Sequence, residues 1–204
     1  VGENGAGKST LLLHLNGYLS AKSGTVRIGD VMVGPKTLPV MRRTVGMVFQ
    51  NPDDQLFMPT VFDDVAFGPL NLGMSSEEVE RKVEEALKTV GAEHLKKRSP
   101  YKLSQGEKRA VSIATVLAMS PDILVMDEPT SSLDPRSRLD LIGLLKTFRH
   151  SKIIATHDLD MAIDLCERAI VLHRGKVMAD GPTMEILRDE PLLHRCRLEK
   201  PLRL

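Results

Sequence analysis

Short runs of apolar residues predict the strands of this chain. Residues 44–50 (TVGMVFQ), 122–127 (DILVMD) and 152–156 (KIIAT) are apolar at their centres, as in strands that are buried on both faces of a sheet. Residues 24–34 and 169–181 instead alternate apolar and polar residues about a turn that contains glycine, and this pattern predicts two hairpins.

Capping residues predict where several helices begin. Ser75 and Glu78 have the spacing of a capping box, and the apolar residues that follow them fall on one helical face. Asp134 followed by Pro135 is typical of an N-cap and a first helical position. We expect helices over residues 11–18, 76–90 and 104–119, from residue 135 onward, and over residues 183–189.

The order of these elements predicts one domain over residues 1–204 with an α/β fold. Residues 1–50 and 120–190 would form the α/β core, and residues 51–119 a mostly helical subdomain inserted into it. The ending, residues 191–204, carries four basic residues. It could touch anionic lipid or a second subunit, but an ordinary solvated tail is the favoured interpretation.

The stretch GENGAGKST fits the phosphate-loop pattern G-x-x-x-x-G-K-[ST] in full. Its glycines let backbone N–H groups turn inward around an anion, and the following helix presents its positive end. Lys8 could then reach the β- and γ-phosphates, the Ser9 hydroxyl could ligate Mg²⁺, and Thr10 could help hold the α-phosphate. A Gly-rich turn without a ligand is the competing interpretation. The predicted loop consists of Gly2, Glu3, Asn4, Gly5, Ala6, Gly7, Lys8, Ser9 and Thr10.

Two adjacent carboxylates, Asp127 and Glu128, end the apolar run at 122–127. Such a pair is costly to bury unless a positive charge faces it. The Mg²⁺ that Ser9 would hold supplies that charge to Asp127. Pro129 disfavours helix at Glu128, so we expect this residue to be extended and to point into the site as a general base for an attacking water. A surface turn with two solvated acids is the alternative.

Residues 103–109 (LSQGEKR) allow two interpretations. Their capping box needs no ligand, yet Ser104 and Gly106 at a helix N-terminus would also suit an anion. Together with the phosphate loop, ILVMDEP, SSLD and a histidine after a strand, this motif resembles the ATP-binding subunits of ABC transporters over nearly the whole chain. The resemblance implies a P-loop NTPase (RecA-like) core with an ABC-type helical subdomain and antiparallel hairpins.

The resemblance also implies an ATPase with ATP and Mg²⁺ as cofactors. Gln50 would contact Mg²⁺ and the attacking water, and His157 would contact the γ-phosphate. Ser104 and Gly106 would bind the γ-phosphate of ATP held by a second ATPase subunit, identical or paralogous, and Asp134 would belong to the loop that crosses between the two. The expected catalytic residues are Lys8, Gln50, Glu128 and His157, and the expected metal ligands are Ser9, Gln50 and Asp127.

The chain departs from the family pattern in two respects. Gln105 stands where the family most often has glycine, a modest change because the expected contacts involve Ser104 and Gly106. The family also has strands and an aromatic residue that stacks on adenine upstream of the phosphate loop. The sequence starts at Val1, directly before the loop, so these strands are expected to be missing and adenine recognition is unassigned.

Residues 49–75 look like the cobalt, nickel and vitamin-uptake branch of the family, the energy-coupling-factor type. Phe49, Phe57, Phe62 and Phe67 lie in this segment. They could form an apolar groove for a helix of a transmembrane subunit, or they could simply pack the helical lobe. The implied function is an ATPase subunit that energises an importer of cobalt or nickel ions or of a vitamin, at the cytoplasmic face of the cell membrane.

Composition agrees with an intracellular protein that reaches the membrane through other chains. Cys166 and Cys196 show no ligand spacing, so we expect free thiols in a cytosolic protein. No run approaches the ~18 apolar residues that a membrane span needs, and no charged-then-apolar leader precedes the phosphate loop.

Two other functions compete with transport. The first is a soluble ABC ATPase that acts on DNA or ribosomes. The net charge of +1 and the lack of a long coiled-coil insertion or a second cassette argue against it, so no nucleic-acid partner is expected. The second is an inactive regulatory nucleotide-binding module. Lys8, Asp127, Glu128 and His157 are all present, and this argues against it.

Overall fold

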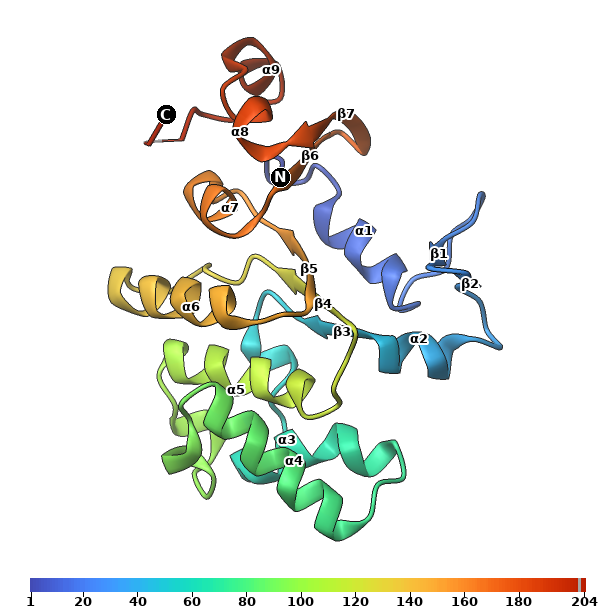
Figure 1. The fold of residues 1–204 in the computed structure, drawn as a ribbon, viewed down its shortest axis with the longest axis vertical. Helices are drawn as coiled ribbons and strands as arrows, with labels where there is room; N and C mark the ends of the chain where they lie inside the picture. The colour runs from blue at the N-terminus through green and yellow to red at the C-terminus, as the bar shows by residue number, and fades with distance from the viewer. Residues whose placement is uncertain (202) are drawn as a thin grey trace.

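A parallel sheet lies at the centre of the computed structural model, which describes residues 1–201 and 203–204 (Figure 1). Its strands are β3 (Val45–Val48), β4 (Ile123–Asp127) and β5 (Ser151–Ala155), in the order β3-β4-β5. Both neighbouring pairs are parallel. The three strands predicted from apolar runs are therefore confirmed.

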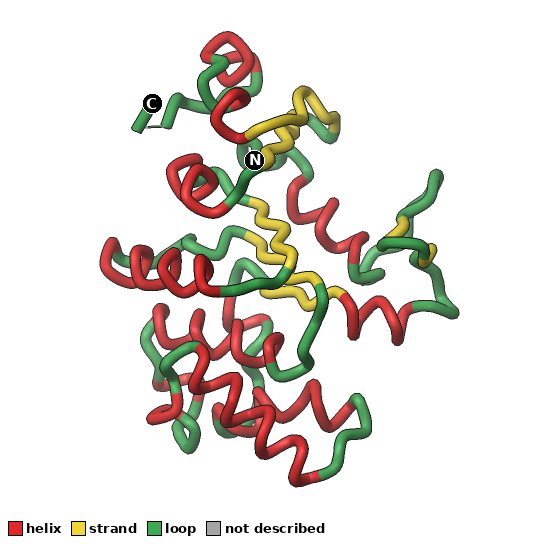
Figure 2. Tube along the Cα trace, in the orientation of Figure 1, coloured by secondary structure: helices red, strands yellow, loops and turns green. Residues whose placement is uncertain are grey.

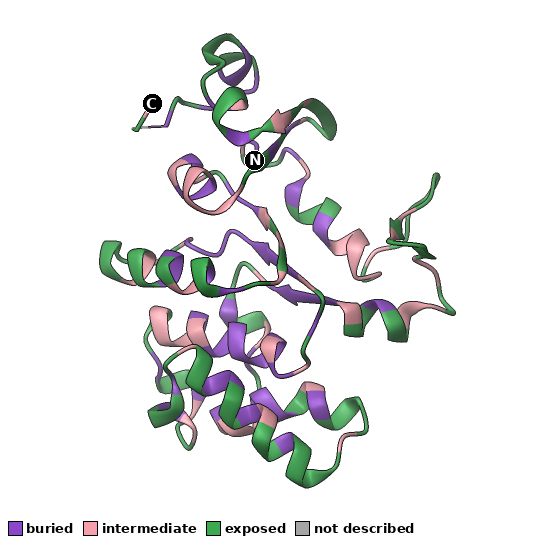
Figure 3. Cartoon of the chain, viewed as in Figure 1, coloured by how far each residue is buried: buried purple, intermediate pink, exposed green. Residues whose placement is uncertain are grey.

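Helices cover both faces of this sheet, as a parallel sheet requires. On one face, Leu12 of α1 (Lys8–Leu15) packs with Met47 and Val125. On the other face, α5 (Gln105–Leu117) and α6 (Pro135–Thr147) pack against the alternate side chains of β3 and β4. Figure 3 shows the buried positions running through the sheet and the inner faces of the helices. Two further helices of this region are α2 (Leu38–Thr44) and α7 (Leu159–Leu165).

A second hydrophobic core holds the helical block below the sheet (Figure 2). The prediction of a separate subdomain over residues 51–119 stays a prediction. The capping box at Ser75 and Glu78 is confirmed, and the predicted apolar face of the helix that it starts is buried. The elements of the block are η1 (Pro52–Asp54), α3 (Val61–Asn71), α4 (Ser76–Thr89), η2 (Glu93–Leu95), η3 (Pro100–Lys102) and α5.

Both predicted hairpins are confirmed. The first joins β1 (Arg27–Ile28) to β2 (Val31–Met32), and the second joins β6 (Arg168–His173) to β7 (Lys176–Pro182). The second hairpin also holds the start of the chain, because Leu172 N–H donates to the carbonyl oxygen of Val1 at 2.9 Å. Residue 1 therefore enters the phosphate loop directly from the edge of β6.

The prediction of a solvated tail over residues 191–204 is wrong for its first half. After α8 (Thr183–Ile186), a further helix, α9 (Glu190–Arg195), buries Leu192 and Leu193 against β6 and α7. Asp189 caps this helix by accepting from Leu192 N–H at 2.9 Å. The apolar residues of this ending outweigh its basic ones in deciding where it lies, since they complete a third hydrophobic cluster.

Two further predictions concern composition. The structure has no helix, among the residues it describes, of the length and apolar character that crossing a bilayer requires. Cys166 and Cys196 are both free thiols, as the sequence predicted.

Candidate functional site: the phosphate loop and the end of strand β4

Residues 2–10 form a tight loop that leads into α1. Gly5 and Gly7 have φ angles of 79° and 97°, a region that only glycine adopts without strain. Helix α1 begins at Lys8 and ends at Leu15, so the predicted range 11–18 is shifted. The shift follows from Gly7, whose left-handed backbone lets the helix start directly after the loop. The N-terminus of α1 thus adjoins the loop, as an anion site requires.

Lys8 is buried and makes three contacts at once. Its ammonium donates to the carbonyl oxygens of Gly2 at 2.8 Å and Glu3 at 3.2 Å. It also lies 3.2 Å from Glu128 Oε1, and the Lys8 side chain is only 7% exposed. The positive charge that compensates Glu128 therefore comes from the chain itself. A phosphate bound in the loop would share this ammonium with Glu128.

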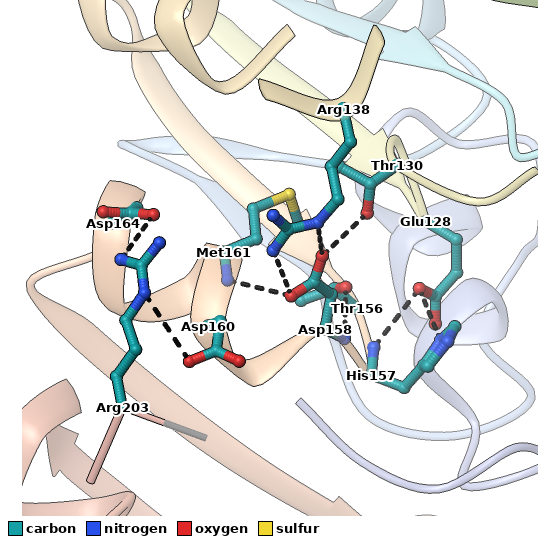
Figure 4. Close-up of polar contacts among 10 residues, drawn as sticks. All are labelled: Glu128, Thr130, Arg138, Thr156, His157, Asp158, Asp160, Met161, Asp164 and Arg203. Atoms are coloured by element: carbon teal, nitrogen blue, oxygen red, sulfur yellow. Dashed lines mark hydrogen bonds and ion pairs between the residues drawn. The ribbon is translucent and has the colours of Figure 1, made fainter. Parts of the chain in front are cut away.

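Glu128 corrects the prediction of an extended residue. Its φ angle is 44°, in the left-handed region. Glu128 N–H donates to Ala155 O at 2.8 Å and its carbonyl accepts from Ser131 N–H at 3.0 Å, so contacts on both sides hold the strained backbone. The bend turns the carboxylate toward His157, whose backbone N–H donates to Oε2 at 3.2 Å and whose ring Nδ1 lies 2.9 Å from it (Figure 4).

Asp127, Ser9 and Gln50, the three expected metal ligands, line one cavity of about 450 Å³. Burial raises the pKa of the Asp127 carboxyl, and the Ser9 hydroxyl beside it acts in the opposite direction. Asp127 Oδ1 is buried and, among the described residues, has no hydrogen-bond partner. A buried carboxylate oxygen with an unused lone pair, beside a hydroxyl and an amide, fits Mg²⁺.

The metal would not have an all-protein cage. The described residues contain no group of three or more His, Cys, Asp or Glu side chains that could hold a metal. Mg²⁺ commonly takes one or two carboxylates together with substrate phosphates and water. A site with Asp127 as its one carboxylate has this ligand composition.

Sequence reasoning missed Arg109. This arginine of α5 is 2% exposed and donates to the carbonyl oxygens of Phe49 at 2.7 Å and Gln50 at 2.6 Å. Burial lowers its pKa to about 10, while the charge of Asp127 acts in the opposite direction. The available signal was its spacing, because Arg109 lies four residues before Ile113 on the buried face of α5. Arg109 fixes the backbone that carries Gln50.

Residues 103–109 (LSQGEKR) contain the capping box that the sequence predicted. Ser104 N–H donates to Glu107 Oε2 at 2.7 Å, and Glu107 N–H donates to Ser104 Oγ at 3.3 Å. A Cβ at Gly106 would stand 2.9 Å from Ser137 Oγ, so any larger residue there would require the Ser137 hydroxyl to move. The structure does not place Ser104 in the cavity with Ser9, but it places Gln105 there.

Asp134 caps α6, as predicted, and is exposed. Its carboxylate accepts from Arg136 N–H, Ser137 N–H and Ser137 Oγ–H, the last at 2.6 Å. These hydrogen bonds lower the pKa of Asp134, the side-chain bond from Ser137 most. Ser137 therefore binds Asp134 and also lies beside Gly106.

Glu3 is the member of the loop whose side chain turns away from it. Its carboxylate lies 2.9 Å from His173 Nδ1 of the second hairpin and 3.8 Å from an Arg197 nitrogen. Only the backbone of Glu3 is thus placed to face a phosphate. Of the other loop residues, Asn4, Ser9 and Thr10 are exposed at the loop surface, and Ala6 is buried.

A glycine-rich loop, a buried lysine and a carboxylate at the end of the central strand define a P-loop nucleotide-binding protein. The family model described as ABC transporter matches residues 1–131. A protein of Geobacter sulfurreducens named as an ABC transporter ATP-binding protein is 67% identical over 202 residues, which cover 99% of this chain and 81% of that protein. This chain belongs to the ABC transporter ATPase family, and its activity is ATP hydrolysis in a transporter.

Two relatives point to one branch of the family. The energy-coupling factor transporter ATP-binding protein EcfA of Carboxydothermus hydrogenoformans is 47% identical over 205 residues, covering 99% of this chain and 76% of that protein. The solved structure of cbiO1 from Clostridium perfringens, part of the ABC transporter complex cbiONQ, superposes with a TM-score of 0.83 at 37% identity. That match covers 96% of this chain and 80% of cbiO1. The fold and the family resemblance expected from the motifs are confirmed.

Proposed function

We propose that the chain hydrolyses Mg-ATP with Glu128 as the general base. The observation that carries this proposal is the position of Glu128, at the end of β4 between Lys8 and His157 and directly after Asp127. The Glu128 carboxylate would accept a proton from the attacking water. His157 would contact the γ-phosphate, and Lys8 would neutralise the β- and γ-phosphates.

Ser9, Gln50 and Asp127 would hold Mg²⁺, which when bound supplies positive charge to the phosphates. The common cavity and the unused oxygen of Asp127 support this assignment. Gln50 depends on Arg109 for its position, because Arg109 binds the carbonyl of Gln50 itself. The backbone of residues 2–7 and the hydroxyl of Thr10 would complete the phosphate site.

The exposed motifs suit a second ATPase subunit. Ser104 lies at the N-terminus of α5 and Asp134 at that of α6, and both are exposed. Ser104 and Gly106 would contact the γ-phosphate of ATP held by the second subunit, and Asp134 would lie at the interface between the two. The single domain over residues 1–204 would then be one half of the ATPase.

The transported substrate is proposed from the relatives. EcfA is named as a subunit of an energy-coupling factor transporter, and cbiO1 as part of cbiONQ. We infer an importer of cobalt or nickel ions or of a vitamin, with this chain bound to transmembrane subunits at the cytoplasmic face of the membrane. Proteoliposomes that hold the chain and its transmembrane subunits should accumulate labelled cobalt, nickel or a vitamin only when Mg-ATP is present. Hydrolysis without ATP-dependent uptake of any of them would reject this substrate class.

Phe57 and Phe67 form an exposed aromatic pair on the helical block. They are 53% and 45% exposed, and their rings meet edge to face at 5.1 Å. Phe62 instead packs into the core of the block, with Lys96 5.2 Å above its ring. We therefore propose a different interpretation for each group of phenylalanines. Phe57 and Phe67 suit a helix of a transmembrane subunit, and Phe62 stabilises the block.

We expect the double change Phe57→Ala and Phe67→Ala to weaken binding of the transmembrane subunits by about tenfold or more, since exposed aromatic anchors dominate such interfaces. Co-purification and titration with the subunits in detergent measure this. Tyr101→Ala removes another exposed aromatic side chain of the block and should leave binding unchanged. Full binding by the double variant would reject the pair as the docking site.

A further inference from the structure

Asp158, the residue after His157, is held by an arginine from another helix. Arg138 of α6 donates from Nε to Asp158 Oδ2 at 2.7 Å and from Nη2 to Oδ1 at 2.8 Å, a two-point ion pair (Figure 4). Both side chains are mostly shielded from solvent. Burial acts to raise the pKa of Asp158, but the hydrogen bonds from Arg138, Met161 and Thr130, together with the charge of Arg138, hold that pKa below its usual value.

The Asp158 carboxylate also fixes the backbone that follows His157 in the chain. Asp158 Oδ1 accepts from Met161 N–H at 2.9 Å and so caps α7. Before His157, the side chain of the buried residue Thr156 accepts a hydrogen bond from Asp158 N–H at 2.9 Å. The His157 ring itself is more than half exposed, so packing does little to hold it. Its distance from Glu128 depends on the backbone between residues 156 and 158.

Arg138 also connects this backbone to the loop that ends at Asp134. The backbone N–H of Arg138 donates to Asp134 O at 2.9 Å in the first turn of α6. Thr130, at the other end of the loop, donates from Oγ1 to Asp158 Oδ2 at 3.3 Å. A shift of the loop would therefore move Asp158 with it. Figure 4 shows Arg138 and Thr130 meeting Asp158 from one side, with His157 and Glu128 on the other.

Other basic side chains form ion pairs with α7 that do not include His157 or Asp158. Arg203 donates to Asp164 Oδ2 at 2.9 Å and lies 3.9 Å from Asp160, and Lys146 contacts Asp164 at 3.2 Å. These contacts hold the outer side of α7. Among the described ion pairs of α7 and its cap, the Arg138–Asp158 pair is the one next to the proposed γ-phosphate contact.

We propose that the Arg138–Asp158 ion pair is a positioning device, which sets His157 against Glu128 and makes its position depend on the loop at residues 130–134. The inference rests on the proposed roles of Glu128 and His157. Because the loop contains Asp134 at the expected subunit interface, the pair would allow hydrolysis only when that loop is in place. Arg138 and Asp158 act through His157 and touch no substrate.

The test is steady-state ATP hydrolysis by the complete assembly with its transmembrane subunits. We expect Arg138→Gln to lower kcat by about tenfold while KM for ATP changes less than about twofold, because a misplaced group impairs reaction more than binding. Asp158→Asn, which can still cap α7, should lower kcat similarly. Arg138→Lys keeps the charge but loses the two-point geometry, so its kcat should lie between those of the wild type and Arg138→Gln.

Arg136→Gln is the matched control. Arg136 lies two residues away on α6 and pairs with Asp140 at 3.1 Å in solvent, so its loss should leave kcat within about twofold. The decisive comparison adds Arg138→Gln to His157→Ala. If Arg138 acts through His157, the double variant should be no slower than His157→Ala alone.

The outcomes separate this inference from the proposed function. Full activity of His157→Ala would overturn the role proposed for His157. An impaired His157→Ala with a fully active Arg138→Gln and Asp158→Asn would overturn only the positioning device. Equal further losses of kcat in the wild-type and His157→Ala backgrounds would also overturn it, because they would show an effect that does not pass through His157. Thermal unfolding of each variant identifies a loss of activity that comes from unfolding, and such a loss with both Arg138→Gln and Asp158→Asn would reject the device.

Discussion

Glu128→Gln is expected to lower kcat for ATP hydrolysis by about 100-fold to 10,000-fold, the usual contribution of a general base. The amide has the shape of the carboxylate but cannot accept the proton of the attacking water. Lys8 would lose its ion pair at 3.2 Å yet keep its bonds to the carbonyls of Gly2 and Glu3. ATP binding should therefore survive. Phosphate release by the complete assembly and binding of labelled ATP measure the two effects.

The same variant reports on the second subunit. If hydrolysis reopens the ATPase dimer, Glu128→Gln with Mg-ATP should remain closed, and light scattering on the isolated chain should show a doubled mass when both subunits are identical. A monomer with bound ATP would indicate a paralogous partner. Glu190→Gln, which changes an exposed glutamate paired with Lys200, is the control and should keep full activity. Normal turnover by Glu128→Gln would refute the proposed base.

Arg109→Met is expected to destabilise the fold by about 2–5 kcal/mol. Methionine fills the space of the side chain but leaves the carbonyls of Phe49 and Gln50 buried without their donor. Removal of a desolvated charge would offset part of this loss. The two acceptors nevertheless remain, so the net effect is a lower free energy of unfolding, which urea titration of the purified chain measures.

Arg109→Met should also affect catalysis, because Gln50 would lose its support. The fall in kcat at temperatures where the variant is folded should exceed the change in ATP affinity. Arg81→Gln is the matched control, since Arg81 pairs with Glu85 on the surface of α4 at 2.9 Å and its loss should cost less than about 0.5 kcal/mol. A variant as stable as the wild type would show that Arg109 does not support the loop after β3.

Features set by neighbouring residues were predictable from the sequence. The caps at Ser75, Ser104 and Asp134 form as expected because each depends on a side chain and a backbone N–H two or three residues away. The phosphate loop has glycines at its left-handed positions for the same local reason. The strands were predictable because a sheet covered on both faces requires apolar runs.

Features set by distant residues were not. Pro129 favours an extended Glu128, but the hydrogen bond from Glu128 N–H to Ala155 O, far along the chain, helps to hold the left-handed backbone together with the bond from Ser131 N–H to Glu128 O. The ending of the chain was expected in solvent because of its basic residues. Its leucines are buried only because α7 and β6 offer an apolar surface, and no local pattern specifies that surface.

The strained backbone of Glu128 is held in place by the buried lysine beside it. A φ of 44° costs an ordinary side chain about 1–2 kcal/mol, a cost that glycine does not carry. Glycine at residue 128 would nevertheless leave the buried Lys8 ammonium without its carboxylate, and breaking a buried ion pair costs about 3–5 kcal/mol. Directed evolution of this chain for heat resistance alone should therefore keep an acidic residue at this strained position, even without a demand for ATP hydrolysis.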